Sequence, residues 1–210
     1  MSLLEAEKNL AIKLAREAGA AILAVYGKPI DIEYKAANQT HPVTEADKAA
    51  NEIIVRGLAQ AFPEDGILAE ESAPNTERLE RRRLWCIDPL DGTNDFLAHN
   101  GEFVVMIGLA INGEARMGVV YHPTEDALFW GSGEEAYVQQ ASGVRALVPT
   151  KTVATATANC VVSRSHPSSR VKRLLTALEV ATERRLGSIG LKVGAVAEGK
   201  ADLYVSFSNN

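Results

Sequence analysis

Apolar residues return at helical spacing in two stretches near the N-terminus. From residue 3 to residue 25 they recur every three or four positions, with basic residues on the other faces, which predicts an amphipathic helix. After the polar stretch YKAANQTH at 34–41, a second pattern of this kind runs from Ala46 to Leu58. Thr44 and Asp47 have the spacing of a capping box, so we predict that the second helix begins at this box.

Short apolar segments bounded by glycine and polar residues follow Pro63 and are typical of strands. They read GILA, LWCI, EFVVMIGLAI, ARMGVVY, ALFWG and EAYVQ. Asn112 and Gly113 form a two-residue hairpin signal between two of them, which predicts an antiparallel meander. Helical spacing returns at 171–178 and more weakly at 190–198, and ADLYVSF at 201–207 predicts a last strand.

The order of these elements favours an α/β (α+β layered) domain with a largely antiparallel sheet over a regular alternation of strands and helices. Periodicity is lost in QASGVRALVPT at 140–150. We therefore predict a division into an N-terminal lobe of residues 1–145, with the helix pair and the sheet, and a C-terminal α/β lobe of residues 146–210.

Composition and charge restrict the classes of partner. The chain has 210 residues, of which 46% are hydrophobic, and its formal net charge of −5 argues against a nucleic-acid polymer or an anionic membrane as partner. No signal-peptide pattern opens the chain, and no apolar run approaches the ~18 residues of a membrane span. Cys86 and Cys160 lie in apolar stretches where a small buried thiol is expected. We expect a soluble protein in a reducing, cytoplasmic setting.

The stretch WCIDPLDGTNDF at 85–96 carries more chemistry than a turn requires. Asp88 and Asp91 are three residues apart across a turn in which Pro89 fixes φ, and two converging carboxylates repel each other unless a cation neutralises them. Oxygen ligands favour a hard cation such as Mg²⁺. If Thr93 begins a helical turn, the amides of Gly92 and Thr93 point at an anion. The stretch predicts a metal on one side and a phosphate on the other.

Other candidate residues have simpler interpretations when each is taken alone. Glu70 and Glu71 in LAEES end a strand where a further metal ligand is expected, although an acidic pair is more often a solvated loop. Asp47 is most simply a helix cap. No GxxxxGK[ST] sequence is present, and the four histidines lack zinc-site spacing. The serines that cluster before a helix favour capping or anion binding over nucleophilic catalysis; they are Ser163, Ser165 and Ser168.

DPLDGTNDF, with PVTEADKAAN before it and LAEES between them, resembles the inositol monophosphatase superfamily of Mg²⁺-dependent, lithium-sensitive phosphatases over residues 3–206. The resemblance implies the sugar-phosphatase fold, with α-β-α-β layers and mainly antiparallel sheets. It implies a centre of two or three Mg²⁺ ions, whose ligands would be Glu70, Asp88, the Leu90 carbonyl and Asp91. It also implies that Asp47 accepts a hydrogen bond from Thr93, and that Thr93 and Glu70 orient and deprotonate the attacking water. The residues implied to bind substrate are Leu90, Asp91, Gly92, Thr93, Ser163, His166 and Lys192.

Several segments resemble the 3'(2'),5'-bisphosphate nucleotidase branch of that superfamily. They are DPLDGTNDF, NGEFVVMIGLAINGEARMGVVYHP, SRSH at 163–166 and GSIGLKVGAVAEGKADLY at 187–204. The resemblance implies that Ser163, His166 and Lys192 line the nucleotide side of the pocket, whereas without it they would be a helix N-terminus and a solvated lysine. Asn94 and Asp95 depart from the lysine and glutamate usual in that branch. The WD motif that carries the family's last metal ligand is absent before Asn210, so we expect the C-terminal lobe to be incomplete at its end.

Our leading hypothesis is a Mg²⁺-dependent phosphomonoesterase that removes the 3'-phosphate of adenosine 3',5'-bisphosphate. The nearest alternative is an inositol or other polyol monophosphatase. The missing WD aspartate motivates a third possibility, a noncatalytic metal or phosphate binder. A glycosidase would use Glu70 and Asp88 as acid and base but leaves Gly92 and Thr93 without a role, and we rank it last. The expected partner is a small phosphorylated substrate, and the expected state is a monomer or homodimer.

Overall fold

Two long helices pack against each other at the start of the chain. The computed structural model describes residues 4–29, 32–34, 42–73, 76–133, 135–148, 152–165 and 167–207. Helix α1 (Glu5–Val25) packs against α2 (Glu45–Ala61), and four of its six buried residues are alanine or glycine; a Cβ atom on Gly57 of α2 would overlap the Leu14 side chain of α1. These small residues allow a close helix pair. The predicted capping box is confirmed, because the Thr44 side chain caps α2 and the Asp47 carboxylate accepts a hydrogen bond from the Thr44 amide.

A seven-stranded sheet follows the helix pair in the order β3-β4-β5-β6-β7-β8-β9. Its strands are β3 (Gly66–Ala69), β4 (Arg83–Asp91), β5 (Val104–Ile111), β6 (Glu114–His122), β7 (Ala127–Ser132), β8 (Glu135–Gln140) and β9 (Gly143–Leu147). β3 and β4 are parallel and the other neighbours are antiparallel, as expected of a meander. The hairpin between β5 and β6 is confirmed, with left-handed φ angles of 55° at Asn112 and 79° at Gly113.

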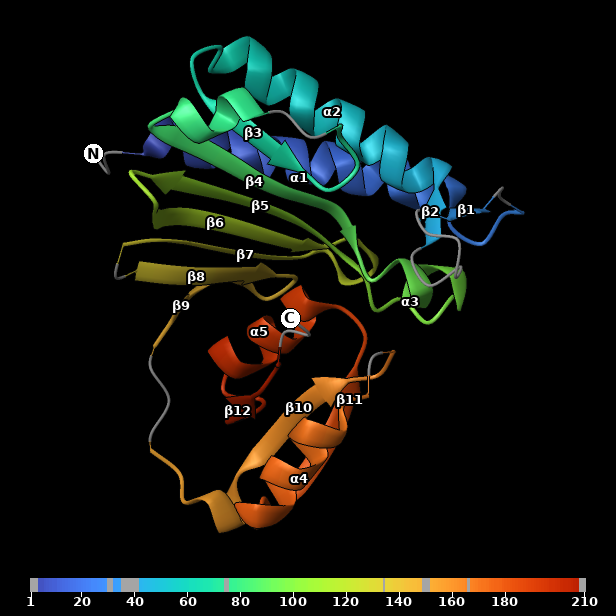
Figure 1. Cartoon of the computed structure of the whole chain (residues 1–210), viewed down its shortest axis with the longest axis vertical. Helices are drawn as coiled ribbons and strands as arrows, with labels where there is room; N and C mark the ends of the chain where they lie inside the picture. The colour runs from blue at the N-terminus through green and yellow to red at the C-terminus, as the bar shows by residue number, and fades with distance from the viewer. Residues whose placement is uncertain are drawn as a thin grey trace.

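The C-terminal lobe is a smaller parallel sheet with two helices. Its strands, in the order β11-β10-β12, are β10 (Asn159–Ser163), β11 (Thr182–Leu186) and β12 (Leu203–Tyr204). Its helices are α4 (Ser169–Ala177) and α5 (Ile189–Ala197). In Figure 1, α1 and α2 cover one face of the large sheet, α5 lies beneath the other face, and the small sheet and α4 lie below α5. The predicted fold class, an α/β layered architecture with a mainly antiparallel large sheet, is confirmed.

The remaining described elements are short. They are β1 (Ile32–Tyr34), β2 (Pro42–Thr44), α3 (Thr93–Leu97), and the 3₁₀ turns η1 (Thr76–Glu80), η2 (Pro123–Glu125) and η3 (Thr155–Thr157). β1 and β2 pair antiparallel beside the start of α2. None of the helices among these described residues has the length and apolar character that crossing a bilayer requires.

Four sequence expectations need correction. ADLYVSF forms a strand only at Leu203–Tyr204, the two residues that pair with β10. Strands β9 and β11 were not predicted, because neither alternates apolar and polar residues; β11 reads TERRL, and four of its five residues are exposed. Strand β10 was also missed.

Cys160 is buried as expected, but Cys86 is exposed, because its side chain lies on the sheet face opposite the buried Trp85 and Ile87. The division after residue 145 remains a prediction, and β9 crosses that position.

Topology positions the residues of interest at one edge of the large sheet. β3 and β4 run parallel with Ala69 opposite Ile87, so the chain leaves both strands at the same end. The Glu70 amide extends this pairing by donating to the Ile87 carbonyl at 3.1 Å. β4 continues to Asp91, and α3 begins two residues later. The residues after GILA and those in DPLDGT are therefore neighbours in space.

Candidate active site

Three carboxylates lie at this edge, and the charges of Glu70 and Asp91 both act on Asp88. Glu70 follows β3, and Asp88 and Asp91 lie at the end of β4, where the pairing with β5 shifts register between the two aspartates. The Leu90 amide donates to Asp88 Oδ1 at 3.2 Å, as in a tight turn. Asp91 Oδ2 accepts from the Ser188 hydroxyl at 2.5 Å and from the Gly190 amide at 2.8 Å. The C-terminal lobe thus supplies donors to one carboxylate of the large sheet.

The electrostatics of this edge favour a bound cation. Burial, followed by the charges of Glu70 and Asp91, raises the pKa of Asp88 to about 8. Burial also raises the pKa of Asp91, although the hydrogen bonds from Ser188 and Gly190 oppose the change. When carboxyl groups share a site, the repulsion between their charges raises their pKa values, unless a nearby positive charge neutralises them. The negative charge at this edge is therefore only partly compensated by the protein itself.

The donor set fits a hard divalent cation. Carboxylate oxygens are present with the backbone oxygen of Leu90, which accepts from the Thr93 hydroxyl at 3.3 Å. Within the described ranges, no group of three or more His, Cys, Asp or Glu side chains is arranged to hold one ion. Mg²⁺ matches such a site, because it is usually bound through one or two carboxylates while water and substrate phosphate fill the other positions.

Asp47 has two roles at the start of α2. It is buried, and its Oδ2 accepts from the Thr44 amide at 2.8 Å and from the Thr44 hydroxyl at 2.6 Å, which completes the capping box. Its Oδ1 accepts from the Thr93 hydroxyl at 3.2 Å. Burial raises the pKa of Asp47, and the bonds from Thr44 oppose the rise. The simple cap and the bond to Thr93 inferred from the resemblance are therefore both present.

Glycine is required where β4 turns into α3. Gly92 has φ 106° and ψ 37°, a left-handed conformation that other residues rarely adopt. A Cβ atom there would also lie 2.8 Å from the Glu102 carbonyl oxygen, closer than a carbon can approach. Thr93 then begins α3, so the predicted helical turn is confirmed. This geometry brings the backbone of Gly92 and Thr93 to the surface beside the three carboxylates.

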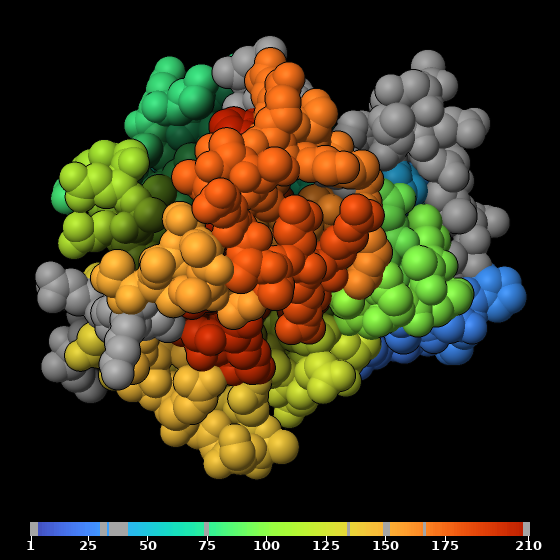
Figure 2. Space-filling view, turned by 90° about the horizontal axis from the view of Figure 1, so that it is seen from below, coloured from blue at the N-terminus to red at the C-terminus, as the bar shows by residue number. Residues whose placement is uncertain are grey.

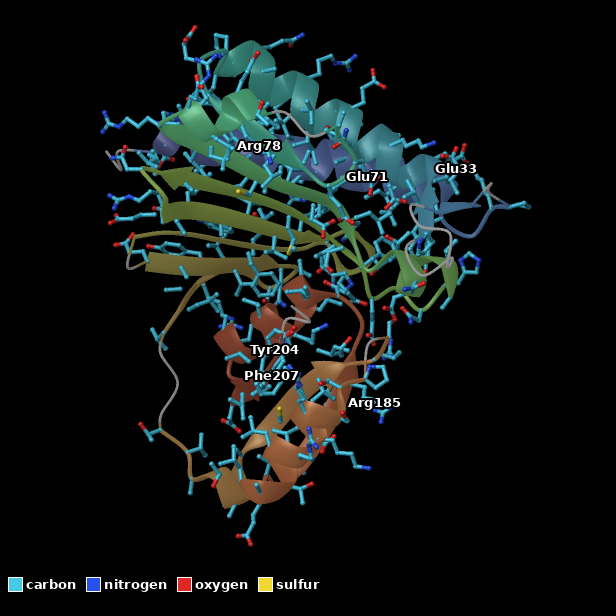
Figure 3. All side chains as sticks on the ribbon, in the orientation of Figure 1. Glu33, Glu71, Arg78, Arg185, Tyr204 and Phe207 are labelled. Carbon is cyan, nitrogen blue, oxygen red and sulfur yellow. The ribbon has the colours of Figure 1, made fainter. Side chains whose placement is uncertain are left out.

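A cleft of about 1130 Å³ separates this edge from the C-terminal lobe. Its large-sheet wall contains Glu70, Asp88, Leu90, Asp91, Gly92, Thr93, Asn94 and Asp95. Its C-terminal wall contains Ser163, Ser165, Arg170, Lys172, Glu183, Arg185, Lys192, Tyr204 and Phe207. Figure 3 labels Arg185, Tyr204 and Phe207, all on the C-terminal lobe beneath the large sheet, and Figure 2 shows that lobe covering the centre of the lower face. One wall is acidic and the other mainly basic.

The residues predicted to bind the nucleotide have different surroundings. Ser163 ends β10 and lines the cleft, and His166 lies outside the described residues. Lys192 also lines the cleft but is not the solvated lysine of the simpler interpretation, because it is 1% exposed. Its Nζ donates to the Gly187 carbonyl at 2.5 Å and lies 5.6 Å from the centre of the Tyr204 ring. Burial lowers the pKa of Lys192, and the charge of Asp91 opposes this change.

Sequence reasoning missed several residues around the cleft. Ser188 was not singled out, because nothing local marks it as the partner of an aspartate 97 positions earlier. Asp95 is buried and bonded to Arg164, whereas Asn94 is exposed on the cleft wall, so the two residues that depart from the pattern of the nucleotidase branch have different surroundings. Ser168 caps α4 as predicted, with its hydroxyl accepting from the Val171 amide at 3.4 Å. Apart from Lys192, which the resemblance had indicated, the basic side chains of the C-terminal wall were not predicted, since they come from two separate elements, α4 and β11.

Comparisons with known proteins agree with this geometry. The model of the inositol monophosphatase family matches residues 4–210. The 3'(2'),5'-bisphosphate nucleotidase CysQ of Shigella flexneri is 40% identical over 198 residues, which cover 93% of this chain and 78% of that protein. Inositol monophosphatase 3 of Solanum lycopersicum is 34% identical over 208 residues, covering 93% of this chain and 75% of that protein. The crystal structure of CysQ from Bacteroides thetaiotaomicron superposes with a TM-score of 0.80 at 30% identity, over 98% of this chain and 81% of that one.

Proposed function

This chain belongs to the inositol monophosphatase family and is a phosphatase, and we propose that it removes the 3'-phosphate of adenosine 3',5'-bisphosphate with Mg²⁺ as cofactor. The observation that carries the proposal is the cleft with one acidic and one basic wall. A substrate with two phosphates has a partner on each wall. An inositol monophosphate would leave the basic wall without a charged partner.

The acidic wall is the proposed place of phosphate hydrolysis. Glu70, Asp88, the Leu90 carbonyl and Asp91 would hold two or three Mg²⁺ ions. When bound, the ions neutralise the phosphate oxygens and the carboxylates around them and lower the pKa of water. The amides of Gly92 and Thr93 would donate to the same phosphate at the start of α3. Asp91 would be held at a fixed angle by its bonds from Ser188 and Gly190.

Thr93, Asp47 and Glu70 are the proposed catalytic residues. The Thr93 hydroxyl has a single proton, which is shared between Asp47 Oδ1 at 3.2 Å and the Leu90 carbonyl at 3.3 Å, so its lone pairs are left to accept from a water molecule. Asp47 and the Leu90 carbonyl would thereby fix the direction in which Thr93 orients that water. Glu70 would take the proton as the water oxygen attacks phosphorus and the bond from phosphorus to the 3'-oxygen breaks. The products are inorganic phosphate and the nucleoside 5'-phosphate, whose 3'-oxygen takes a proton from solvent.

The basic wall is the proposed place of the 5'-phosphate and the nucleoside. Arg170, Lys172 and Arg185 line it, and none of the three forms a salt bridge with another described residue. Guanidinium groups recognise phosphate well, because their parallel donors match two phosphate oxygens. Ser163 and Lys192 lie on the same wall and would contribute polar contacts to the substrate.

The test compares two substrates and two neighbouring arginines. Phosphate release would be measured from adenosine 3',5'-bisphosphate and from inositol 1-phosphate at equal Mg²⁺. Arg185→Gln removes a cleft arginine, and Arg184→Gln is the matched control, because the adjacent residue of the strand points to the other side and does not line the cleft. We expect wild-type protein to prefer the bisphosphate, and Arg185→Gln to raise KM for it by about 10-fold while Arg184→Gln changes KM by less than about 2-fold.

Two results would overturn the proposal. Faster hydrolysis of inositol 1-phosphate by the wild-type protein identifies a polyol monophosphatase with the same centre. If Mg²⁺ stimulates phosphate release from neither ester, and Asp88→Asn leaves any residual activity unchanged, the protein is a noncatalytic metal or phosphate binder.

A further inference from the structure

An ion-pair network joins the two lobes beside the cleft. Arg164 follows β10, and its guanidinium donates to Asp95 Oδ1 at 2.9 Å and to Glu102 Oε1 at 2.7 Å. Asp95 belongs to α3 and Glu102 to the segment between α3 and β5, so both carboxylates come from the N-terminal lobe. One arginine of the C-terminal lobe therefore bridges two carboxylates of the other lobe.

The two carboxylates also contact the end of the neighbouring strand. Glu102 Oε2 accepts from the Gly187 amide, directly after β11, at 2.7 Å. A Cβ atom on Gly187 would overlap the carboxylate of Asp95, so glycine is needed for this approach. Asp95 further accepts from the Asn100 side chain at 2.6 Å and from the Ser165 hydroxyl at 3.3 Å. The ends of β10 and β11 are thus both tied to the segment that follows DPLDGT.

The tied strand ends carry the C-terminal wall of the cleft. Ser163 ends β10 immediately before Arg164, and Arg185 lies two residues before Gly187. Immediately after Gly187, Ser188 donates to Asp91. The hydrogen bonds that Arg164, Gly187 and Ser188 donate to the N-terminal lobe therefore fix the distance between the acidic and basic walls.

We propose that Asp95, Glu102 and Arg164 form an interlobe clamp that holds the basic wall of the cleft at a fixed distance from the acidic wall, and so act as positioning residues for a substrate that spans both. The inference rests on the proposed function, because only a substrate with groups on both walls responds to their spacing. None of the three is assigned contact with the reacting phosphate. Opening the clamp weakens binding of the part of the substrate on the C-terminal lobe and leaves the acidic wall in place.

A second interlobe pair provides the matched control. Arg145 of β9 donates to Glu198, which follows α5, at 2.6 Å, and neither residue lines the cleft. Arg145→Gln therefore removes an arginine that also joins the two lobes but lies away from the substrate. Arg164→Gln removes the charge and opens the proposed clamp. Arg164→Lys keeps the charge but loses the planar guanidinium, whose separate N–H donors contact the two carboxylates.

The experiment combines steady-state kinetics with deuterium exchange of the metal-free protein. We expect Arg164→Gln to raise KM for adenosine 3',5'-bisphosphate by about 10-fold with kcat changed less than about 3-fold, and Arg164→Lys to lie between it and wild type. Arg145→Gln should change KM by less than about 2-fold. Deuterium uptake at residues 186–190 should rise in Arg164→Gln and stay at the wild-type level in Arg145→Gln. Melting temperatures of both variants show whether their loss of stability is comparable.

Each outcome separates the clamp from the proposed function. If KM and uptake change no more in Arg164→Gln than in Arg145→Gln, the clamp is overturned. If uptake rises but KM does not, the network only stabilises the fold, and its positioning role is overturned. If the wild-type protein hydrolyses neither ester, the proposed function fails, and uptake at 186–190 alone decides whether Arg164 holds the two lobes together.

Discussion

Replacing Asp88 by asparagine is expected to stabilise the metal-free protein at alkaline pH while abolishing activity. Burial and the neighbouring charges of Glu70 and Asp91 raise the pKa of Asp88 from 3.8 to about 8. Between these two pH values the folded protein holds a proton on Asp88 that the unfolded chain has released, so the free energy of unfolding falls as pH rises through this interval. Asparagine carries no charge at any of these pH values and removes this contribution.

The expected magnitude follows from the difference between the two pKa values. A difference of about four units corresponds to at most about 6 kcal/mol at 1.36 kcal/mol per unit. Solvent at the cleft and the sharing of protons among three carboxylates reduce the effect, so we expect Asp88→Asn to gain about 1–3 kcal/mol at pH 8 and close to nothing at pH 4. Asp47 and Asp91 also have raised pKa values, and only the difference between variant and wild type isolates Asp88.

Urea unfolding in a chelator at pH 4, 6 and 8 measures the effect, and a second series contains saturating Mg²⁺. Mg²⁺ should stabilise the wild-type protein, by about 2.7 kcal/mol at a concentration of one hundred times Kd, and the variant far less. Asp126→Asn is the control, because its hydrogen bond from Arg16 lowers the pKa of Asp126 and the substitution should not stabilise at pH 8. If the free energy of unfolding of Asp88→Asn at pH 8 without metal is no higher than that of the wild-type protein, the argument that repulsion among these carboxylates destabilises the metal-free fold is refuted.

Three further predictions concern other residues of the fold. Asp47→Ala should cost about 1–2 kcal/mol in urea unfolding through loss of the capping box and should lower kcat in the phosphate-release assay; an unchanged kcat would contradict the proposed catalytic role. Gly92→Ala should cost about 2–4 kcal/mol in urea unfolding, whereas Gly133→Ala, also at positive φ but in open space, should cost only about 1 kcal/mol. In the native protein, a thiol reagent should modify the exposed Cys86 and not the buried Cys160; modification of both would contradict their burial.

The sequence was informative wherever the signal is local. The helix faces, the capping box at Thr44 and the hairpin at Asn112 each depend on residues within a few positions, and all three are confirmed. Strand β11 was missed because an exposed strand has no buried face to impose alternation. Strand β10 was missed although Cys160, Val161 and Val162 are buried, because a short apolar run alone does not distinguish a strand from a helix.

The same distinction applies to the candidate site. The spacing within DPLDGT and the order of the acidic segments were enough to expect Glu70, Asp88 and Asp91 at one edge, where the parallel pairing of β3 and β4 brings them together. The residues that hydrogen-bond this edge from distant parts of the chain, such as Ser188, carry no local sequence pattern that predicts their position. Without the resemblance, Lys192 was expected to be a solvent-exposed lysine. Its burial could not be predicted from local sequence, because a buried lysine needs hydrogen-bond acceptors that only the folded chain supplies, here the carbonyl of Gly187.

The bonds from Ser188 and Gly190 to Asp91 have a consequence for synthesis of the chain on the ribosome. Asp88 and Asp91 emerge about one hundred residues before these donors, and domains generally fold from the N-terminal end as they are made. The large sheet can therefore assemble while the charge of Asp91 still lacks these two donors. Docking of the C-terminal lobe then supplies both donors, so the acidic edge reaches its described geometry only after residues 188–190 have been made.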